Sequence, residues 1–119
     1  MANIRQSLED LLTADGAMCA AVVDSTSGMM LGSAGSGVDL EVAAAGNTEV
    51  VRAKMKTMRS LGLNDVIDDI LITLGKQYHI IRPVSRKEGT FVYFVLDKSK
   101  SNLALARRKC QDVERELTI

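Results

Sequence analysis

Residues 39–62 read DLEVAAAGNTEVVRAKMKTMRSLG and form the longest stretch with helical periodicity in the sequence. Asp39 is a residue type that caps helix N-termini, and Gly62 is the usual residue just after a helix. The spacing predicts a single helix, about 36 Å long at 1.5 Å per residue. A helix of that length can cover more than its own sheet, so its apolar pattern indicates how the molecule is organised.

Apolar residues on this helix form two stripes. The stripe predicted to dock on the sheet carries the larger side chains: Leu40, Ala44, Val51, Met55 and Met58. The second stripe carries mostly small side chains. Together with Asn47 and Lys54, which lie between the two stripes, it makes up eight positions, which we call the small-residue stripe: Ala43, Gly46, Asn47, Val50, Ala53, Lys54, Thr57 and Leu61. Small residues three and four apart let backbones approach closely, so we expect this stripe to pair antiparallel with its equivalent in a second copy. The alternative is tight docking on the chain's own sheet.

The remaining face of the helix is charged and must face water. It carries Glu41 and three bases, which form a possible partner surface: Arg52, Lys56 and Arg59.

The sequence before this helix predicts a shorter helix and a hairpin. Apolar residues at helical spacing indicate a helix over roughly residues 3–13, and residues 17–23 form a continuous apolar run typical of a central strand. A turn at residues 24–28 leads to a short strand at residues 29–31, and the glycine-rich residues 32–37 are predicted to be a flexible loop.

The sequence after the long helix predicts three strands and a last helix. The strands are expected at residues 66–74, 77–84 and 90–96, the last being the most apolar. Ser101 or Asn102 then caps a helix whose core face is Leu103, Ala106, Cys110, Val113 and Leu117.

The element order is therefore α-β-β-α-β-β-β-α, an α+β (α/β) domain spanning residues 1–119. Hairpin connections imply a five-stranded antiparallel sheet with helices on both faces. The strand at residues 66–74 carries Asp68 and Asp69, which suits an edge. In the antiparallel dimer, two such edges related by a twofold axis could pair and merge the two sheets. We therefore assign Asp68, Ile70 and Ile72 to the predicted dimer interface, in addition to the small-residue stripe.

Four segments together resemble the roadblock/dynein light chain family, most closely its small stand-alone bacterial members. They are the hairpin at residues 16–31, the helix at residues 39–62, the run ILITLGKQYHIIRP at residues 70–83, and NLALAR at residues 102–107. The resemblance covers nearly the whole chain and implies a roadblock/profilin-like fold. It also implies a non-enzymatic dimer, formed through the second helix and third strand, that regulates a small Ras-like GTPase in trans or scaffolds a signalling complex.

Composition excludes several other classes. The 119 residues include 15 basic and 15 acidic side chains, two Cys and one His, so general phosphate-backbone binding and a Cys/His zinc site are disfavoured. The longest apolar run has seven residues, too few to span a membrane, and the N-terminus does not resemble a signal peptide, which predicts a cytoplasmic protein. The charge is segregated: residues 1–46 hold one base and six acids, against fourteen bases and nine acids in residues 47–119.

Candidate chemistry is sparse, so we expect no enzyme activity, metal or cofactor. His79 lies on an alternating strand without a nucleophile motif, and Cys19 and Cys110 look like small buried hydrophobes. Asp65, Asp68 and Asp69 lack the spacing of a calcium loop, and the bases at positions 98, 100 and 107–109 are expected to be a solvated face, with an anionic membrane as the minority alternative. The competing hypothesis is a small-molecule sensor with a pocket between sheet and helices, lined by some of the six methionines.

Overall fold

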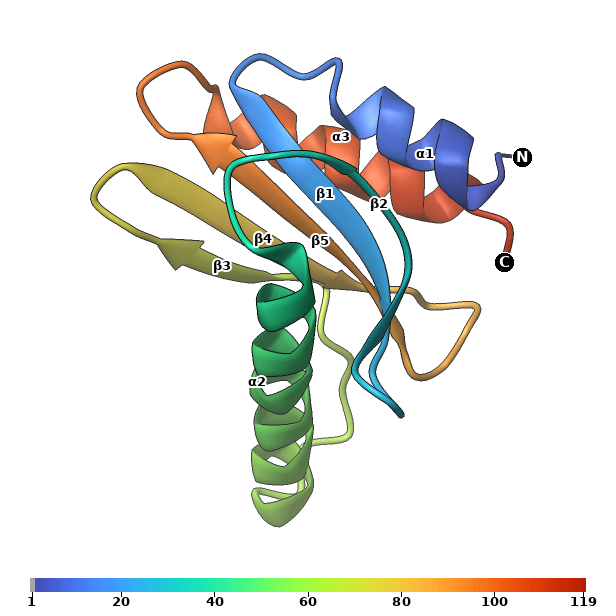
Figure 1. Ribbon diagram of the computed structural model, residues 1–119. Helices are drawn as coiled ribbons and strands as arrows, with labels where there is room; N and C mark the ends of the chain where they lie inside the picture. Colours follow the sequence, from blue (N-terminus) through green and yellow to red (C-terminus); the bar gives the residue numbers. More distant parts are fainter. Residues whose placement is uncertain (1) are drawn as a thin grey trace.

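A computed structural model describes residues 2–119 and contains one five-stranded sheet and three helices (Figure 1). The elements are α1 (Ile4–Leu11), β1 (Ala17–Asp24), β2 (Met29–Gly35), α2 (Leu40–Ser60), β3 (Ile70–Thr73), β4 (Gln77–Pro83), β5 (Thr90–Asp97) and α3 (Leu103–Glu116). All strand pairs are antiparallel, in the order β2-β1-β5-β4-β3. The predicted element order is confirmed, as are the central position of β5 and the edge position of β3.

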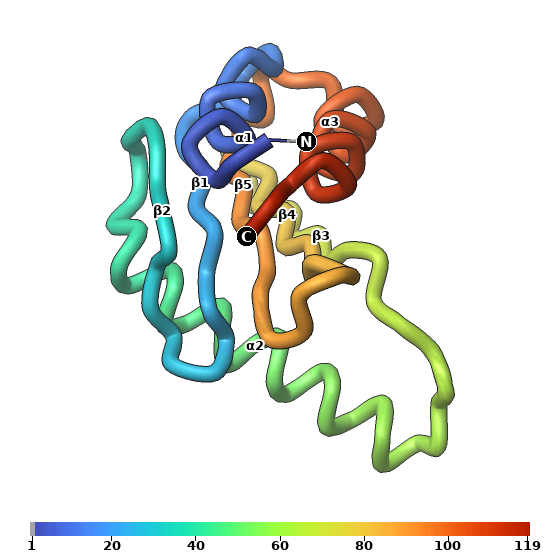
Figure 2. Tube along the Cα trace, turned by 90° about the vertical axis from the view of Figure 1, so that its right-hand side faces the viewer, coloured from blue at the N-terminus to red at the C-terminus, as the bar shows by residue number. Residues whose placement is uncertain are grey.

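Helices cover both faces of the sheet, as predicted. α1 and α3 lie side by side over one face, and α2 lies against the other (Figures 1 and 2). The continuous apolar runs of β1 and β5 follow from this arrangement, because alternate residues of each strand enter opposite cores. On β5, for example, Phe94 packs with α1 and α3, whereas Tyr93 packs on the side of α2.

The helix ends carry the expected caps. The Asp39 carboxylate accepts a hydrogen bond from the Val42 N–H at 3.2 Å, and Gly62 follows α2 with a φ of +69°, a conformation that suits glycine. Of the two residues predicted to cap the last helix, Asn102 does so, accepting from the Leu105 N–H at 3.1 Å. Within residues 2–119, no helix combines the length and apolar character needed to cross a membrane.

α2 docks on the sheet through only part of its predicted stripe. Ala44, Thr48 and Val51 are buried, whereas Met55 is 39% exposed. The C-terminal half of the helix extends past the end of the sheet (Figures 1 and 2), and neither Met55 nor Met58 belongs to the described core cluster on this face. The predicted docking of these two methionines on the sheet is therefore wrong.

The glycine-rich segment after residue 31 was expected to be a loop, and this prediction is wrong for residues 32–35. These residues continue β2 and pair with β1, from Gly32 opposite Val22 to Gly35 opposite Cys19. Glycine is needed here because a side chain at Gly32 would lie 2.6 Å from Ile4 of α1, and one at Gly35 would collide with the Met18 carbonyl oxygen. Glycines that serve close packing were thus mistaken for glycines that serve flexibility.

The third strand is shorter than predicted, because residues 66–69 lie outside the sheet. The Val84 N–H bonds to β5 and the Leu74 N–H bonds to Gln77, so in this alternating ladder Pro83 faces the β3 side. The register that pairs Ile70 with Ile81 would place Asp68 opposite Pro83. Proline has no N–H to donate, so the ladder cannot continue and β3 begins at Ile70.

Candidate functional site

The small-residue stripe of α2 lies at the surface. Six of its eight predicted seam positions are exposed, and the other two, Ala43 and Asn47, are half-buried at the margin of the core. Val50 is 38% exposed and Leu61 is 65% exposed. A side chain added at Gly46 would meet no atom within 4 Å, which leaves room for another backbone to approach.

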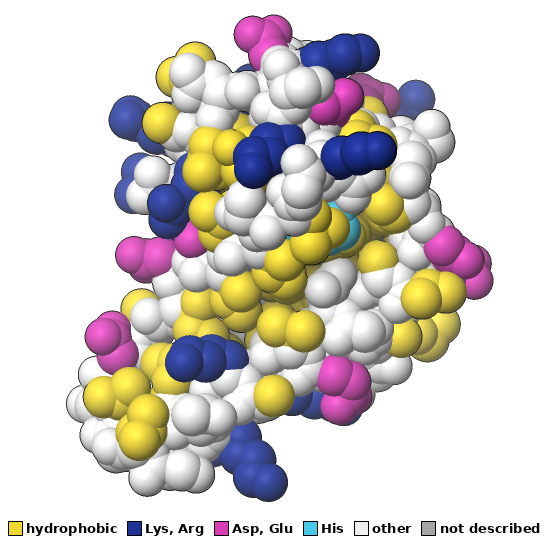
Figure 3. All heavy atoms as spheres, turned by 90° about the vertical axis from the view of Figure 1, so that its left-hand side faces the viewer, with side chains coloured by type: hydrophobic (Ala, Val, Ile, Leu, Met, Phe, Trp, Pro, Cys, Tyr) yellow, Lys and Arg dark blue, Asp and Glu magenta, His cyan; other side chains and the backbone are white. Residues whose placement is uncertain are grey.

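A free sheet edge and an apolar face lie next to this helix. The outer edge of β3 pairs with no strand among residues 2–119, and Ile70 and Ile72 are half-buried against the α2-side core. Hydrophobic side chains form a broad band across this side of the molecule, with the single histidine near its centre (Figure 3). Asp68, also assigned to the interface, is exposed and precedes the strand instead of lying on it.

The three bases of the predicted partner surface are in different environments. The Arg52 guanidinium donates to the Thr26 carbonyl oxygen at 2.8 Å and lies 3.6 Å from the Glu49 carboxylate. It therefore fastens α2 to the β1–β2 turn. Lys56 and Arg59 are exposed on the half of α2 that projects beyond the sheet.

A directional chain of hydrogen bonds crosses the α2 side of the sheet. The Asn47 amide donates to the Tyr93 phenol oxygen, and the Tyr93 hydroxyl lies 2.9 Å from His79 Nδ1. His79 Nε2 lies 2.8 Å from Gln77 Oε1, while Gln77 Nε2 donates to the Met18 sulfur at 3.8 Å. With the amide in this orientation, His79 Nε2 donates to Gln77, and in the neutral ring Nδ1 accepts from the Tyr93 hydroxyl.

Protonation of His79 would change this chain of hydrogen bonds. A second proton, on Nδ1, would face the Tyr93 hydroxyl hydrogen and force it to turn away. Burial lowers the pKa of His79 below its ordinary value of 6.5, which favours the same neutral state. Burial also raises the pKa of Tyr93. The arrangement holds the Tyr93 hydroxyl, the His79 ring and the Gln77 amide in fixed positions on the α2 side of the sheet.

Both cysteines are buried and free, as expected from their apolar neighbours. Burial raises the pKa of the Cys110 thiol to about 12, and the pKa of Cys19 is raised for the same reason. A thiol with a raised pKa is a poor nucleophile and a poor metal ligand.

The basic cluster around the last helix is largely paired with acids. The Arg107 guanidinium contacts both carboxylate oxygens of Asp69, at 2.9 and 3.0 Å, and thereby fixes the segment before β3 to α3. Lys109 lies 2.7 Å from Asp10, which links α3 to α1. Asp65, Asp68 and Asp69 were expected to form a solvated strand end, but Asp69 is held against α3 by this ion pair. Within residues 2–119, no three His, Cys, Asp or Glu side chains are grouped to hold a metal ion.

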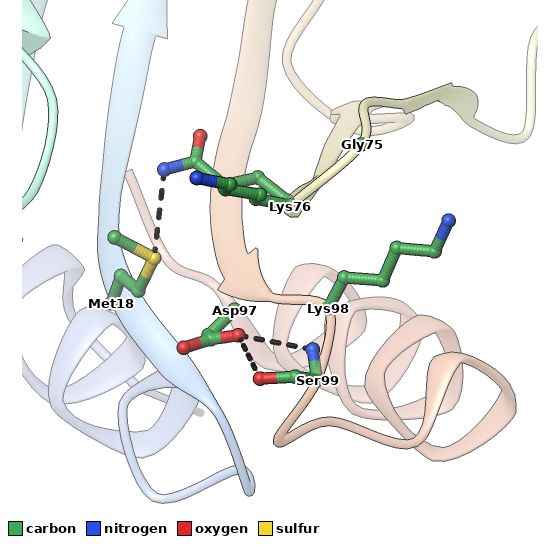
Figure 4. Close-up of a pocket in the computed structure, with 7 residues that line it drawn as sticks. Met18, Gly75, Lys76, Asp97, Lys98 and Ser99 are labelled. Carbon is green, nitrogen blue, oxygen red and sulfur yellow. Dashed lines mark hydrogen bonds between the residues drawn. The ribbon is translucent and has the colours of Figure 1, made fainter.

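A hollow at one end of the sheet lies between the start of β1, the β3–β4 turn and the end of β5 (Figure 4). The Asp97 carboxylate accepts from the Ser99 N–H at 3.0 Å and from its hydroxyl at 2.7 Å, and these bonds lower the pKa of Asp97. The Lys98 ammonium lies 5.8 Å from the centre of the Tyr78 ring. The Asp97 carboxylate is thus occupied by Ser99, and Lys98 lies over a ring outside the lining of the hollow.

Sequence reasoning missed a buried ion pair between Arg82 and Glu114. The Arg82 Nε donates to a Glu114 carboxylate oxygen at 3.0 Å, with the two side chains 12% and 3% exposed. Ser85 contacts the second carboxylate oxygen at 3.3 Å. One signal was available, because Glu114 follows Cys110 by four residues and so lies on the buried side of α3.

Sequence comparison identifies no relative. No protein-family model matches the chain, and no curated protein matches it.

Solved structures match the chain over nearly its whole length. A Roadblock/LC7 domain from Streptomyces avermitilis superposes with a TM-score of 0.81 at 10% identity, over 97% of this chain and 94% of its own. MglB from Myxococcus xanthus gives 0.82 at 19% identity, over 95% and 89%. An MglB described in a tetrameric arrangement gives 0.71 at 17% identity, over 95% and 88%. The chain has the Roadblock/LC7 fold, as the resemblance in its sequence predicts.

Proposed function

We propose that the chain is a non-enzymatic, cytoplasmic homodimer that serves as a regulatory or scaffold module for a small Ras-like GTPase, or for a signalling complex associated with one. The observation that carries the proposal is the accessible small-residue stripe of α2, beside a free β3 edge. The eight stripe positions, together with Asp68, Ile70 and Ile72, form the proposed interface.

The energetic case for dimerisation rests on what the isolated chain leaves in water. Val50 and Leu61 expose apolar surface on the stripe, and the open space at Gly46 allows close helix packing. The unpaired backbone groups of β3 would gain partners in a second β3 edge. A twofold axis satisfies both contacts with one set of residues. The likeness to an MglB in a tetrameric arrangement supports self-association.

The case against an enzyme rests on the chemistry-bearing side chains. Burial lowers the pKa of His79, whose ring lies between Gln77 and Tyr93, and both thiols are buried with raised pKa values. The GTPase proposal rests on what the family resemblance implies, with Lys56 and Arg59 as the exposed bases available to a partner.

Val50→Arg tests the dimer. Because it places an unpaired charge in the seam, we expect a monomer where the unaltered chain is a dimer. Ala45→Arg is the matched control, since Ala45 is exposed on the charged face of the same helix and its change should leave the dimer intact. Light scattering at micromolar concentration measures the molar mass of both variants. A monomeric unaltered chain would contradict the proposed interface.

Co-purification tests the GTPase partner. The tagged chain should enrich an endogenous Ras-like GTPase from its native cell in the GDP-bound or the GTP-bound state. Lys56→Gln with Arg59→Gln should reduce that enrichment at a concentration where sedimentation still shows a dimer. The absence of enrichment in both nucleotide states would remove the GTPase from the proposal without affecting the dimer.

A further inference from the structure

A cavity of about 570 Å³ lies at the end of the sheet where α2 projects beyond it. It opens between the C-terminal half of α2, the return segment at residues 65–68, and the β4–β5 connection, at the lower end of the molecule in Figure 1. It exists because Pro83 stops the β3 ladder, which leaves the end of β4 without a strand beside it. Its volume lies within the range of ordinary ligand sites.

One wall of the cavity is apolar and adaptable. Val51, Met55 and Met58 line it from α2, and Val66 faces them from the return segment. Met55 is 39% exposed and Val66 is 79% exposed, so this apolar surface is accessible in the isolated chain. Methionine side chains are flexible and polarizable, and they adapt to apolar groups of different shapes.

The exposed charged side chains that line the cavity are mostly acidic. Arg82 lines it, but its guanidinium is paired with the buried Glu114 carboxylate. Of the other charged residues, Asp65, Asp68 and Glu88 are acidic and exposed, against the single base Arg115. The accessible charge therefore favours a cationic group over an anionic one.

We propose that this cavity binds a basic amphipathic segment of a partner protein. Its apolar side chains would lie on the methionine wall, and its Lys or Arg side chains would lie near the carboxylates. The carboxylates come from two separate elements, the return segment and the β4–β5 connection, which suits a segment with several positive charges better than a small molecule with one. Of the residues named for the cavity, only Asp68 also belongs to the proposed dimer interface.

The probe is a synthetic amphipathic helix made only of Leu and Lys, compared with its Leu/Glu counterpart. Methionines labelled with ¹³C at the methyl group locate binding by NMR. The Leu/Lys helix should shift the Met55 and Met58 signals and leave that of Met29, which lies on β2, in place. The Leu/Glu helix should shift neither.

Asp65→Asn combined with Glu88→Gln should weaken binding of the Leu/Lys helix about five-fold, as expected for the loss of two exposed ion pairs. Asp15→Asn, which removes an exposed carboxylate near the opposite end of the sheet, is the control and should bind like the unaltered chain. Sedimentation of the same samples separates this proposal from the proposed dimer. A chain that is monomeric and still binds the Leu/Lys helix would refute only the dimer.

Three results would overturn the proposal. The first is equal binding of the acidic helix, and the second is a shift of the Met29 signal with Met55 and Met58 unchanged. The third is no binding of the basic helix together with thermal stabilisation by a compound from a metabolite panel, which would assign the cavity to a small-molecule sensor.

Discussion

His79 shows how a single residue acquires its state from its neighbours. Its ring lies 5.5 Å from that of Tyr93 in an edge-to-face arrangement, and both ring nitrogens have hydrogen-bond partners. The sequence showed the strand alternation that places His79 and Ile81 on one face. It could not show that Tyr93, fourteen residues away, would lie within hydrogen-bond distance of His79 Nδ1.

This environment gives stability a definite dependence on pH. The folded pKa of His79 lies below the unfolded value of 6.5, so the unfolded chain binds the proton more readily. The stabilisation is present above 6.5, and the free energy of unfolding should fall as the pH drops through that value towards the folded pKa. Urea unfolding between about pH 7 and pH 5.5 should show the decrease, and His79→Gln should flatten it. An equal decrease in the variant would assign the effect to other groups.

α2 shows how one element can serve two surfaces. Its N-terminal part docks through Ala44, Thr48 and Val51, while its C-terminal part leaves Met55 and Met58 to line a cavity. Thr48 is polar yet only 2% exposed, which is possible because its hydroxyl donates to the Ala44 carbonyl oxygen at 2.7 Å. The two-stripe pattern was therefore readable, but where the first stripe stops contacting the sheet was not.

Gly46 tests whether the small residues of α2 serve a seam. In the monomer, Gly46→Ala should raise the free energy of unfolding by about 0.5–1 kcal/mol, because alanine favours the helix and the added methyl group meets open space. In the dimer the same methyl group should hold the helices apart and weaken association. Thermal unfolding of Gly46→Ala in the monomeric Val50→Arg variant measures the effect on monomer stability. Sedimentation of Gly46→Ala alone measures the effect on association. Tighter association would favour the alternative in which no close helix contact exists.

At the scale of the whole molecule, the segregated charge is partly used inside the chain. Lys109 of the basic part contacts Asp10 of the acidic part, and Arg52 is tied to the β1–β2 turn. Other bases, such as Arg107 and Arg82, pair with acids from their own part. What remains available on α2 is the acidic start at Asp39 and Glu41 and the basic end at residues 56–59.

Salt tests whether these ends meet in the dimer. Antiparallel helices would place each acidic start near the partner's basic end, so the dissociation constant should rise a few-fold between about 50 mM and 500 mM NaCl. Glu41→Gln should make this dependence shallower. Sedimentation equilibrium over the salt series provides the measurement. A constant or falling dissociation constant would show that the apolar contacts alone hold the dimer.

From the sequence alone we could predict the order of the elements, the Asp39 cap of α2, the central and edge strands, and the two stripes of α2. These depend on side-chain periodicity and on cap chemistry within a few residues, which a linear chain displays directly. The choice between Ser101 and Asn102 as the cap of α3 needed the structure. Only the tertiary structure decided where β3 begins, that Gly32 and Gly35 belong to a strand, and that Arg82 meets Glu114. Each of these depends on segments that are distant in the sequence and adjacent in space. Pro83 has no N–H to donate to Asp68, which would lie opposite it, and Glu114 of α3 pairs with Arg82 of β4. The cavity beside Met55 and Met58 has the same origin, because it is bounded by elements that only folding brings together.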